Sequence, residues 1–256
     1  MQKYFNLFTP NRIAMEIIPD IELAAIDWLN QHKKLAENQR KPLVTLSYAQ
    51  TLDGSLTIRR GRPIGLSGPQ SQRLTHRLRA SHDAILIGIG TVLSDDPQLT
   101  VRLVKGKNPQ PIILDSRLRI PLECQLLRRQ DCKVWVACAV TAEETRQRRL
   151  LQRGVELIPL PRRGDRGLDL EKLLHELWQR GIESVMVEGG AKVLTSFLTE
   201  RLADLAVITI VPRWLGGVNV ISHQRASDQL PSLNHVRYEV FGRDVVVFGD
   251  LDWSER

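Results

Sequence analysis

The segment VMVEGGAKVLTSFL, residues 185–198, carries the pattern that decides the fold. An apolar run ends at Glu188, two glycines follow, and an amphipathic segment begins directly afterwards. A buried strand that passes through a short turn into a one-faced helix is the repeating unit of parallel sheets. The backbone N–H groups of Gly189, Gly190 and Ala191 would be free at such a helix start and could bind a pyrophosphate. A plain strand-to-helix turn explains the same residues equally well.

The same unit recurs along the chain. Candidate strands are Leu43–Ser47, Ala84–Gly88, Pro111–Asp115, Lys133–Ala139, Val155–Leu160, Glu183–Val187 and Ala206–Val211. Amphipathic candidate helices between several of them are Pro69–Ser81, Thr141–Arg153, Leu168–Arg180 and Ala191–Arg201. This alternation predicts an α/β fold with a mainly parallel sheet and helices on both faces. Two apolar runs near the end, Tyr238–Val240 and Asp244–Phe248, predict a C-terminal antiparallel hairpin.

Local signals also predict helix starts and the domain division. Thr141–Glu144 has the spacing of a capping box, and Pro69 preceded by Ser67 or Gly68 is typical of a helix start. No Pro-, Gly- or Ser-rich linker divides the chain. We therefore expect one domain over residues 41–256, preceded by an N-terminal helical extension, residues 1–40, whose segment Ile21–Leu35 packs on the outside.

Composition limits the classes of function. Lysine and arginine exceed aspartate and glutamate by 36 − 29 = 7, which suits a polyanionic ligand. The charge is spread along the chain and only 5% of residues are aromatic, so nucleic acid is not the expected partner. No apolar run is long enough to span a membrane, and no leader pattern is present, which predicts a cytoplasmic protein. The three cysteines lack C-x-x-C spacing and predict free thiols rather than a metal site.

A second strand end, in AILIGIGTVLSDDPQLTVR at residues 84–102, combines two kinds of group. Gly88, Gly90 and Thr91 could let a phosphate approach the backbone, although the third glycine of the dinucleotide fingerprint is missing. Asp95 and Asp96 follow, and Asp96 precedes a proline, so these two acids could also form only a turn.

Five ordered segments resemble the reductase of riboflavin biosynthesis, which is the C-terminal half of the bacterial bifunctional deaminase–reductase and its stand-alone fungal and archaeal relatives. The matching segments are VTLSYAQTLDG at 44–54, THRLRASHDAILIGIGTVLSDDPQLTVR at 75–102, PIILDSRLRIP at 111–121, SVMVEGGAKVL at 184–194 and VPRWLGG at 211–217. They cover about residues 42 to 250 in the right order. The zinc deaminase signature of the bifunctional proteins is absent, so deamination is not expected.

The resemblance implies a dihydrofolate-reductase-like fold, NADPH as cofactor, a homodimer, and reduction of a phosphoribosylamino-pyrimidine, in its 2,5-diamino or 5-amino form, to its ribitylamino form. Cofactor positions carried over from the family are Ala49, Thr91, Asp95, Ser116, Gly189, Gly190 and Ala191. Substrate positions are Ser67, Arg79, Leu99, Arg102 and Glu188. We expect Ser116 and Arg117 near the adenosine 2′-phosphate.

Either of two acids could serve the chemistry. A group that donates a proton or stabilises a cationic iminium makes hydride addition at the ribose C1′ easier, and Asp95 or Glu188 could do this. We favour Asp95, and we expect Arg102 to bind the substrate phosphate. A folate-type reductase and a non-catalytic paralogue that binds a nucleotide or nucleic acid remain as alternatives.

Overall fold

The computed structural model describes residues 21–36, 40–59, 61–62, 64–164, 167–221 and 231–254. Among these residues the main sheet has the strands β1 (Leu43–Thr51), β3 (Ala84–Gly88), β4 (Gln110–Leu114), β5 (Trp135–Ala139), β6 (Glu156–Leu160), β7 (Ser184–Val187), β8 (Leu205–Val211), β10 (Ser232–Phe241) and β11 (Asp244–Asp252). Their order across the sheet is β10-β11-β8-β1-β7-β3-β4-β5-β6. Two short strands, β2 (Ser55–Thr57) and β9 (Val218–Asn219), pair separately.

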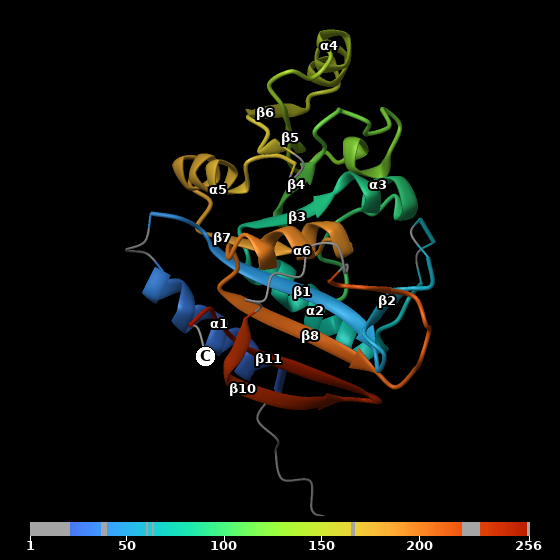
Figure 1. Cartoon of the computed structure of the whole chain (residues 1–256), viewed down its shortest axis with the longest axis vertical. Helices are drawn as coiled ribbons and strands as arrows, with labels where there is room; N and C mark the ends of the chain where they lie inside the picture. The colour runs from blue at the N-terminus through green and yellow to red at the C-terminus, as the bar shows by residue number, and fades with distance from the viewer. Residues whose placement is uncertain are drawn as a thin grey trace, which may run out of the picture.

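All pairings from β8 to β6 are parallel, whereas β11 is antiparallel to both β8 and β10. The helices are α1 (Ile21–Ala36), α2 (Pro69–Ser81), α3 (Ile89–Asp95), α4 (Glu144–Gln152), α5 (Leu170–Gln179) and α6 (Ala191–Thr199), with a 3₁₀ turn, η2 (Gln125–Arg128). The predicted parallel sheet with a C-terminal antiparallel hairpin is thus confirmed (Figure 1).

Alternate residues of the strands point to opposite faces, and both faces are covered. On β3, Leu86 packs into the cluster that α5 and α6 cover, while Ile85 and Ile87 pack into the cluster that includes residues of α3 and α4. A third cluster joins α1 and α2 to β8 and β11 through Trp28, Leu74 and other buried side chains. These helices hold the strand ends rigidly, which lets the loops that follow the strands form a defined site.

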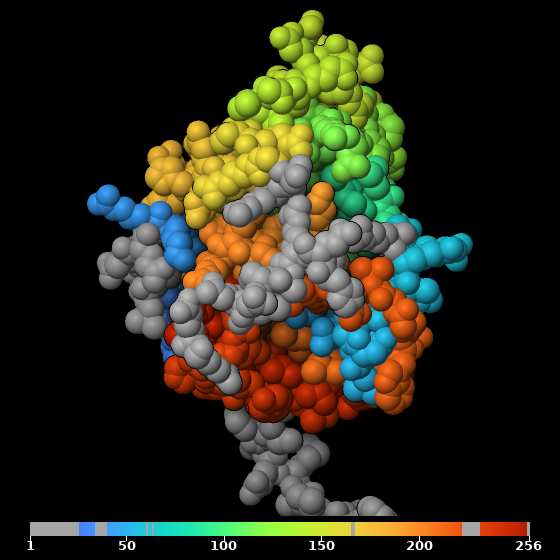
Figure 2. All heavy atoms as spheres, viewed as in Figure 1, coloured from blue at the N-terminus to red at the C-terminus, as the bar shows by residue number. Residues whose placement is uncertain are grey.

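The two edges of the sheet lie at opposite ends of the molecule, with β6 and α4 at one end and the hairpin β10–β11 at the other (Figure 1). In the space-filling view, the atoms of α4 and of the C-terminal strands lie at these opposite ends (Figure 2). On the edge strand β10, Tyr238 is 69% exposed and Val240 is 66% exposed. This hairpin therefore presents apolar side chains beside a strand edge that pairs with no other strand of the described residues.

Two local predictions are wrong. The capping box does not form, because α4 begins at Glu144 with Glu143 as its N-cap and no side chain caps it. Residues 89–95, which are not among the predicted helices, fold into α3, whose N-cap is Gly88. A helix of seven residues is too short to show an apolar period.

Helix α2 is capped by a residue far away in the sequence. Its N-cap, Gly68, has no side chain, and Ser67 does not cap it. The carboxylate of the buried Asp244, at the start of β11, accepts hydrogen bonds from the Gly68 N–H (2.7 Å) and the Ser71 hydroxyl (2.8 Å). Asp244 thus stabilises the orphan donors of α2 from the hairpin.

Helix α1 packs against α2 and the C-terminal strands. Trp28 lies 5.4 Å from Phe248 between ring centroids, and the His32 ring contacts the Asp250 carboxylate at 2.9 Å. Residues 1–20, ahead of α1, lie outside the described part of the chain.

Candidate active site

One cavity of about 1000 Å³ lies at the carboxyl ends of β1, β3, β4 and β7. Its wall includes every residue predicted for the cofactor: Ala49, Thr91, Asp95, Ser116, Gly189, Gly190 and Ala191. It also includes four residues predicted for the substrate: Ser67, Arg79, Arg102 and Glu188. Parallel strands end at the same edge of a sheet, which explains how segments so distant in the sequence meet here.

Leu99 does not line this cavity. Its backbone is left-handed, with φ of 54°, and its side chain is 3% exposed and packs in the core cluster that contains Val92 and Leu118. The Leu99 side chain therefore does not reach the cavity, and the predicted contact between Leu99 and the substrate stays a prediction. The left-handed turn directs the side chain into the core, and no local sequence pattern indicates that backbone conformation.

The glycines at the ends of β3 and β7 serve two different purposes. A Cβ at Gly88 would lie 2.7 Å from the Val193 side chain, and one at Gly189 would lie 2.5 Å from it, so both are required by the close packing of α6. A Cβ at Gly90 would meet nothing within 4 Å, and one at Gly190 only the Thr91 hydroxyl at 3.8 Å. These two glycines line the cavity and leave space in it.

The start of α6 is open to a ligand. Its N-cap is Gly190, no side chain caps it, and its first turn holds no acidic residue. Ala191 and Lys192 also line the cavity. Free N–H groups at a helix start, together with the helix dipole, favour an anion at this point.

Glu188 and Arg79 form a two-pronged ion pair in the cavity wall. The Arg79 Nε donates to one carboxylate oxygen at 2.7 Å and its Nη2 to the other at 2.6 Å. The Arg79 Nη1 donates to the Thr100 carbonyl at 3.2 Å, so all three nitrogens have protein partners. Burial opposes the charge of Arg79, but Glu188 outweighs it and raises the pKa of Arg79. Arg79 thus orients Glu188 and attaches the 99–102 segment to α2.

The two neighbouring aspartates have different environments. Asp95 is the last residue of α3. Its side chain is exposed, lines the cavity and accepts a hydrogen bond from the Ser94 hydroxyl. Asp96 adopts a left-handed conformation that ends the helix, and its carboxylate accepts from the Gln125 N–H at 2.8 Å. Asp95 is therefore the carboxylate that faces the cavity, and Asp96 is the residue that ends the helix.

Sequence reasoning missed His76, which lies on α2 one turn before Arg79 and lines the cavity. The Arg102 backbone N–H donates to the His76 Nδ1 at 2.9 Å. Burial and the charges of Arg79 and Arg102 lower the pKa of His76 to about 4. The i, i+3 spacing from Arg79 places both on one helix face and could have identified it.

The basic residues after β4 also differ from expectation. Ser116 lines the cavity as predicted, but Arg119 rather than Arg117 accompanies it there. The Arg119 Nε lies 3.8 Å from the carboxylate of the buried Asp115. Tyr48 is a further lining residue, and burial raises its pKa to about 12, so its hydroxyl keeps its proton.

The turn TLDG, residues 51–54, connects the end of β1 to a segment far along the chain. Asp53 accepts hydrogen bonds from Thr51 and Ser55 and from the backbone N–H groups of Leu215 (3.2 Å) and Gly216 (2.7 Å). The hydrogen bond from Thr51, followed by those from Gly216, Ser55 and Leu215, holds the pKa of Asp53 well below its usual range. Asp53 therefore fastens the 213–217 segment to the turn after β1.

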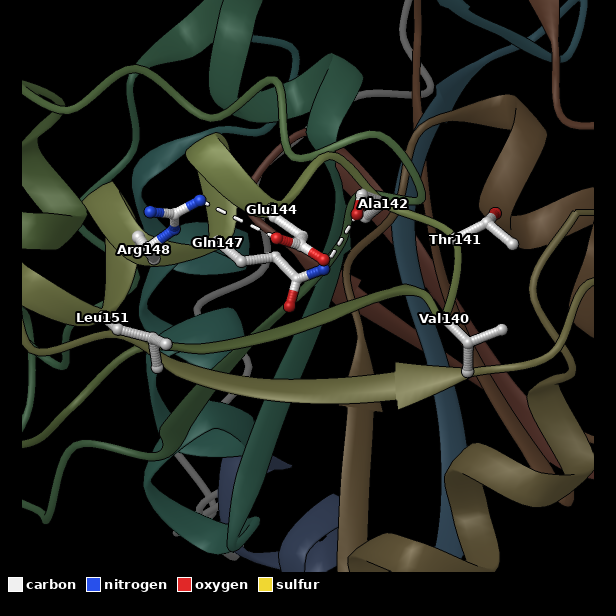
Figure 3. Close-up of a pocket in the computed structure, with 7 residues that line it drawn as sticks. All are labelled: Val140, Thr141, Ala142, Glu144, Gln147, Arg148 and Leu151. Atoms are coloured by element: carbon white, nitrogen blue, oxygen red, sulfur yellow. Dashed lines mark hydrogen bonds and ion pairs between the residues drawn. The ribbon is translucent and has the colours of Figure 1, made fainter.

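A second hollow, of about 610 Å³, lies against α4 (Figure 3). The side chains of Glu144 and Arg148 form an ion pair of 3.7 Å within it, and Gln147 donates to the Ala142 carbonyl at 2.8 Å. It holds none of the predicted site residues. In the described part of the chain, no cluster of three or more histidine, cysteine or acidic residues could hold a metal, and no helix is long and apolar enough to cross a membrane.

An α/β fold with a glycine-lined cavity at the carboxyl ends of central parallel strands is typical of proteins that bind their ligands in that crevice. The chain belongs to the RibD C-terminal domain family, whose model matches residues 42–247. The predicted resemblance is confirmed.

Individual relatives agree with this family. A 2,5-diamino-6-ribosylamino-4(3H)-pyrimidinone 5′-phosphate reductase of Aquifex aeolicus is 36% identical over 184 residues, which cover 70% of this chain and 81% of that protein. The riboflavin biosynthesis protein RibD of the same organism is 34% identical over 213 residues, and the match covers 82% of this chain but 58% of that protein.

Among solved structures, the Saccharomyces cerevisiae riboflavin biosynthesis reductase Rib7 superimposes with a TM-score of 0.67 at 30% identity, covering 84% of this chain and 92% of that one. RibD of Acinetobacter baumannii gives a TM-score of 0.75 at 25% identity, covering 88% of this chain and 62% of that one. The chain thus corresponds to most of the stand-alone reductases and to part of RibD.

Proposed function

We propose that this chain catalyses the NADPH-dependent reduction of a phosphoribosylamino-pyrimidine, in its 2,5-diamino or 5-amino form, to the ribitylamino 5′-phosphate. The observation that carries the proposal is the single cavity whose wall joins an open helix start to the Arg79–Glu188 pair and Arg102. Relatives that the chain matches over most of their length support the proposal, because they are named as pyrimidinone phosphate reductases.

The residues present fit a dinucleotide. Gly90 and Gly190 leave space in the cavity that side chains would fill, and the first N–H groups of α6 have no capping side chain. When bound, NADPH supplies the hydride of the reaction. In the proposal, Gly189, Gly190 and Ala191 hold its pyrophosphate through their backbone.

Other cofactor contacts come from the neighbouring strand ends. Ala49 and Thr91 border the same space, and Ser116 with Arg119 supplies a hydroxyl and a guanidinium for the 2′-phosphate. We assign the 2′-phosphate to Arg119 instead of Arg117 because Arg119 lines the cavity.

The substrate lies toward α2 in this proposal. The exposed Arg102 binds the 5′-phosphate, and Ser67 borders the same part of the cavity. Glu188, oriented by Arg79, binds the ribose or the pyrimidine. Asp95 is the acid that holds the proton for the reacting nitrogen or stabilises its positive charge as hydride arrives.

The domain division and the assembly also remain proposals. We propose that residues 41–256 form the reductase domain and residues 1–40 a helical extension, and that two copies form a homodimer near the C-terminal strands. The exposed apolar side chains of β10 support the dimer. All three cysteines are free thiols, which fits the reducing cytoplasm that the sequence predicts.

One assay tests the function. NADPH oxidation is followed with the 2,5-diamino and the 5-amino pyrimidine phosphates side by side, and the ribitylamino product is identified by mass. We expect turnover with one or both. Reduction of dihydrofolate alone would instead assign a folate-type reductase, and salt-sensitive DNA binding without NADPH affinity would assign a repurposed paralogue.

A further inference from the structure

We propose that His76 is a further substrate-binding residue, whose Nε2–H donates a hydrogen bond to the 5′-phosphate of the phosphoribosyl group beside Arg102. This inference rests on the proposed function and adds to it a residue that neither the motifs nor the family resemblance identified. It begins with the position of the ring. His76 lines the cavity from α2 and is 6% exposed.

The hydrogen bonds of the ring fix which nitrogen carries the proton. Nδ1 accepts from the Arg102 backbone N–H at 2.9 Å, so Nδ1 has no proton and Nε2 must carry it in the uncharged ring. Among the described residues, Nε2 has no hydrogen-bond partner. Nε2 is not among the fully buried polar atoms of the described residues, so this donor is accessible from the cavity that His76 lines and can bind a ligand oxygen there.

The charges around the ring identify the kind of oxygen. The groups that face His76 are Arg79, Arg102 and Glu188. Glu188 is already engaged by two nitrogens of Arg79, whereas the Arg102 guanidinium contacts only the uncharged Gln98 and Thr100 side chains. Arg102 is thus the cation beside His76 that is not paired with an acid among the described residues. An anion that binds Arg102 lies next to the His76 ring.

The ring is a donor and not the acid of the reaction. Burial and the two arginines lower the pKa of His76 to about 4, so the ring is uncharged near neutral pH. An uncharged imidazole holds its remaining proton too tightly to transfer it, but that N–H can still bind a phosphate oxygen. His76 therefore affects binding of the substrate more than the rate of the chemical step.

Two substitutions separate the two ring nitrogens. The amide of asparagine reaches about as far from the backbone as Nδ1, so His76→Asn keeps an acceptor for the Arg102 N–H and loses the donor at Nε2. The amide of glutamine reaches about as far as Nε2, so His76→Gln keeps the donor. If the phosphate contact is real, His76→Asn should lose more affinity than His76→Gln.

The probe is ribose 5-phosphate, with ribose as its uncharged control. Calorimetry should show that His76→Asn weakens binding of ribose 5-phosphate about 10- to 100-fold, as expected for a lost hydrogen bond to a charged group, and that His76→Gln weakens it less. In the reductase assay the same ranking should appear in KM for the pyrimidine phosphate, while KM for NADPH and the thermal midpoint stay close to wild type.

Several outcomes overturn the inference: equal affinities in all three proteins, a loss in His76→Gln as large as that in His76→Asn, equal losses for ribose and ribose 5-phosphate, or no measurable binding of ribose 5-phosphate by the wild type. Because this binding measurement needs no turnover, it also separates the two proposals. A protein that binds ribose 5-phosphate in the expected ranking but reduces no pyrimidine keeps the His76 site and loses the proposed function.

Discussion

At the scale of single residues, the two candidate acids differ in what already holds them. Glu188 is paired with Arg79 through two hydrogen bonds, whereas Asp95 has no cationic partner among the described residues. Arg79 already engages both carboxylate oxygens of Glu188, whereas the exposed Asp95 carboxylate is open to the cavity and to a ligand in it. This difference favours Asp95 as the acid.

Asp95→Asn should therefore slow hydride transfer in single turnovers at saturating ligands by roughly 10²- to 10⁴-fold, the range for a positioned acid or base. Glu188→Gln breaks the ion pair and should chiefly raise KM for the pyrimidine and lower the thermal midpoint. If neither substitution slows the single turnover, the assignment of the chemistry to these acids is wrong.

Arg119 and Arg117 form a matched pair for the cofactor. Arg119→Ala should reduce the preference in kcat/KM for NADPH over NADH about 10- to 100-fold, because a guanidinium on a phosphate is a strong charge-assisted contact. Arg117→Ala, which removes the same charge two residues away but outside the cavity wall, should leave the preference close to wild type. A larger loss of preference in Arg117→Ala would assign the 2′-phosphate to Arg117 instead. Equal kcat/KM for NADPH and NADH in the wild type would show that neither arginine binds a 2′-phosphate.

At the scale of elements, periodicity predicted most of the sheet and its helices. Runs such as Ala84–Gly88 have the boundaries that the sequence indicated, because a buried parallel strand must be apolar throughout. It could not predict α3, β2 or β9, which are too short for a period, or the cap of α2. That cap comes from Asp244, more than 170 residues along the chain, and only tertiary structure brings it to Gly68.

The candidate site was predictable to a similar degree. The strand ends, and with them the glycine turn and Glu188, follow from the alternation of strands and helices. The contacts that each side chain makes do not follow from that alternation. That Arg79 binds Glu188 and the Thr100 carbonyl, or that Leu99 turns into the core, depends on side-chain directions that no local pattern encodes.

Asp244 gives the prediction at this scale. Asp244→Ala should lower the free energy of unfolding by about 1 to 3 kcal/mol, because it leaves the half-buried Gly68 N–H and the buried Ser71 hydroxyl without their acceptor. Asp244→Asn keeps an acceptor oxygen and should lose clearly less. Denaturant unfolding of both variants measures this, and equal losses would show that the charge, not the cap, stabilises α2.

At the scale of the whole molecule, the proposed dimer depends on the hairpin edge. Light scattering at micromolar concentration should give a dimer for the wild type and a monomer for Tyr238→Asp, since a charge in an apolar interface is costly. Leu151→Asp is the control, because Leu151 is 53% exposed on α4 at the opposite end of the sheet. A wild-type monomer would count decisively against the dimer.

Acid should weaken the whole fold through its buried histidines. His82 is buried between the Leu78 carbonyl (2.7 Å) and the Thr45 hydroxyl (2.9 Å), and burial lowers its pKa to about 4. In the unfolded chain its pKa is near 6.5, so the unfolded state takes up the proton first. The stabilisation is complete above about pH 6.5 and is lost as the pH falls toward about 4.

Protonation of His82 should lower the free energy of unfolding by up to about 3 kcal/mol, and protonation of His76 should lower it further. Denaturant unfolding from about pH 7 to about pH 4.5 measures the slope, and His82→Gln should flatten it while lowering stability at neutral pH. An unchanged slope in that variant would mean that other groups cause the acid sensitivity.

Val193 limits which residues can occupy the ends of two strands. Its side chain occupies the volume that any larger residue at Gly88 or Gly189 would need. An alanine at either glycine can then be accepted only after position 193 has become smaller, and a valine cannot return once that has happened. Three positions from β3, the turn after β7 and α6 are therefore sterically coupled, and we expect related sequences to carry a larger residue at position 88 or 189 only where position 193 is smaller than valine.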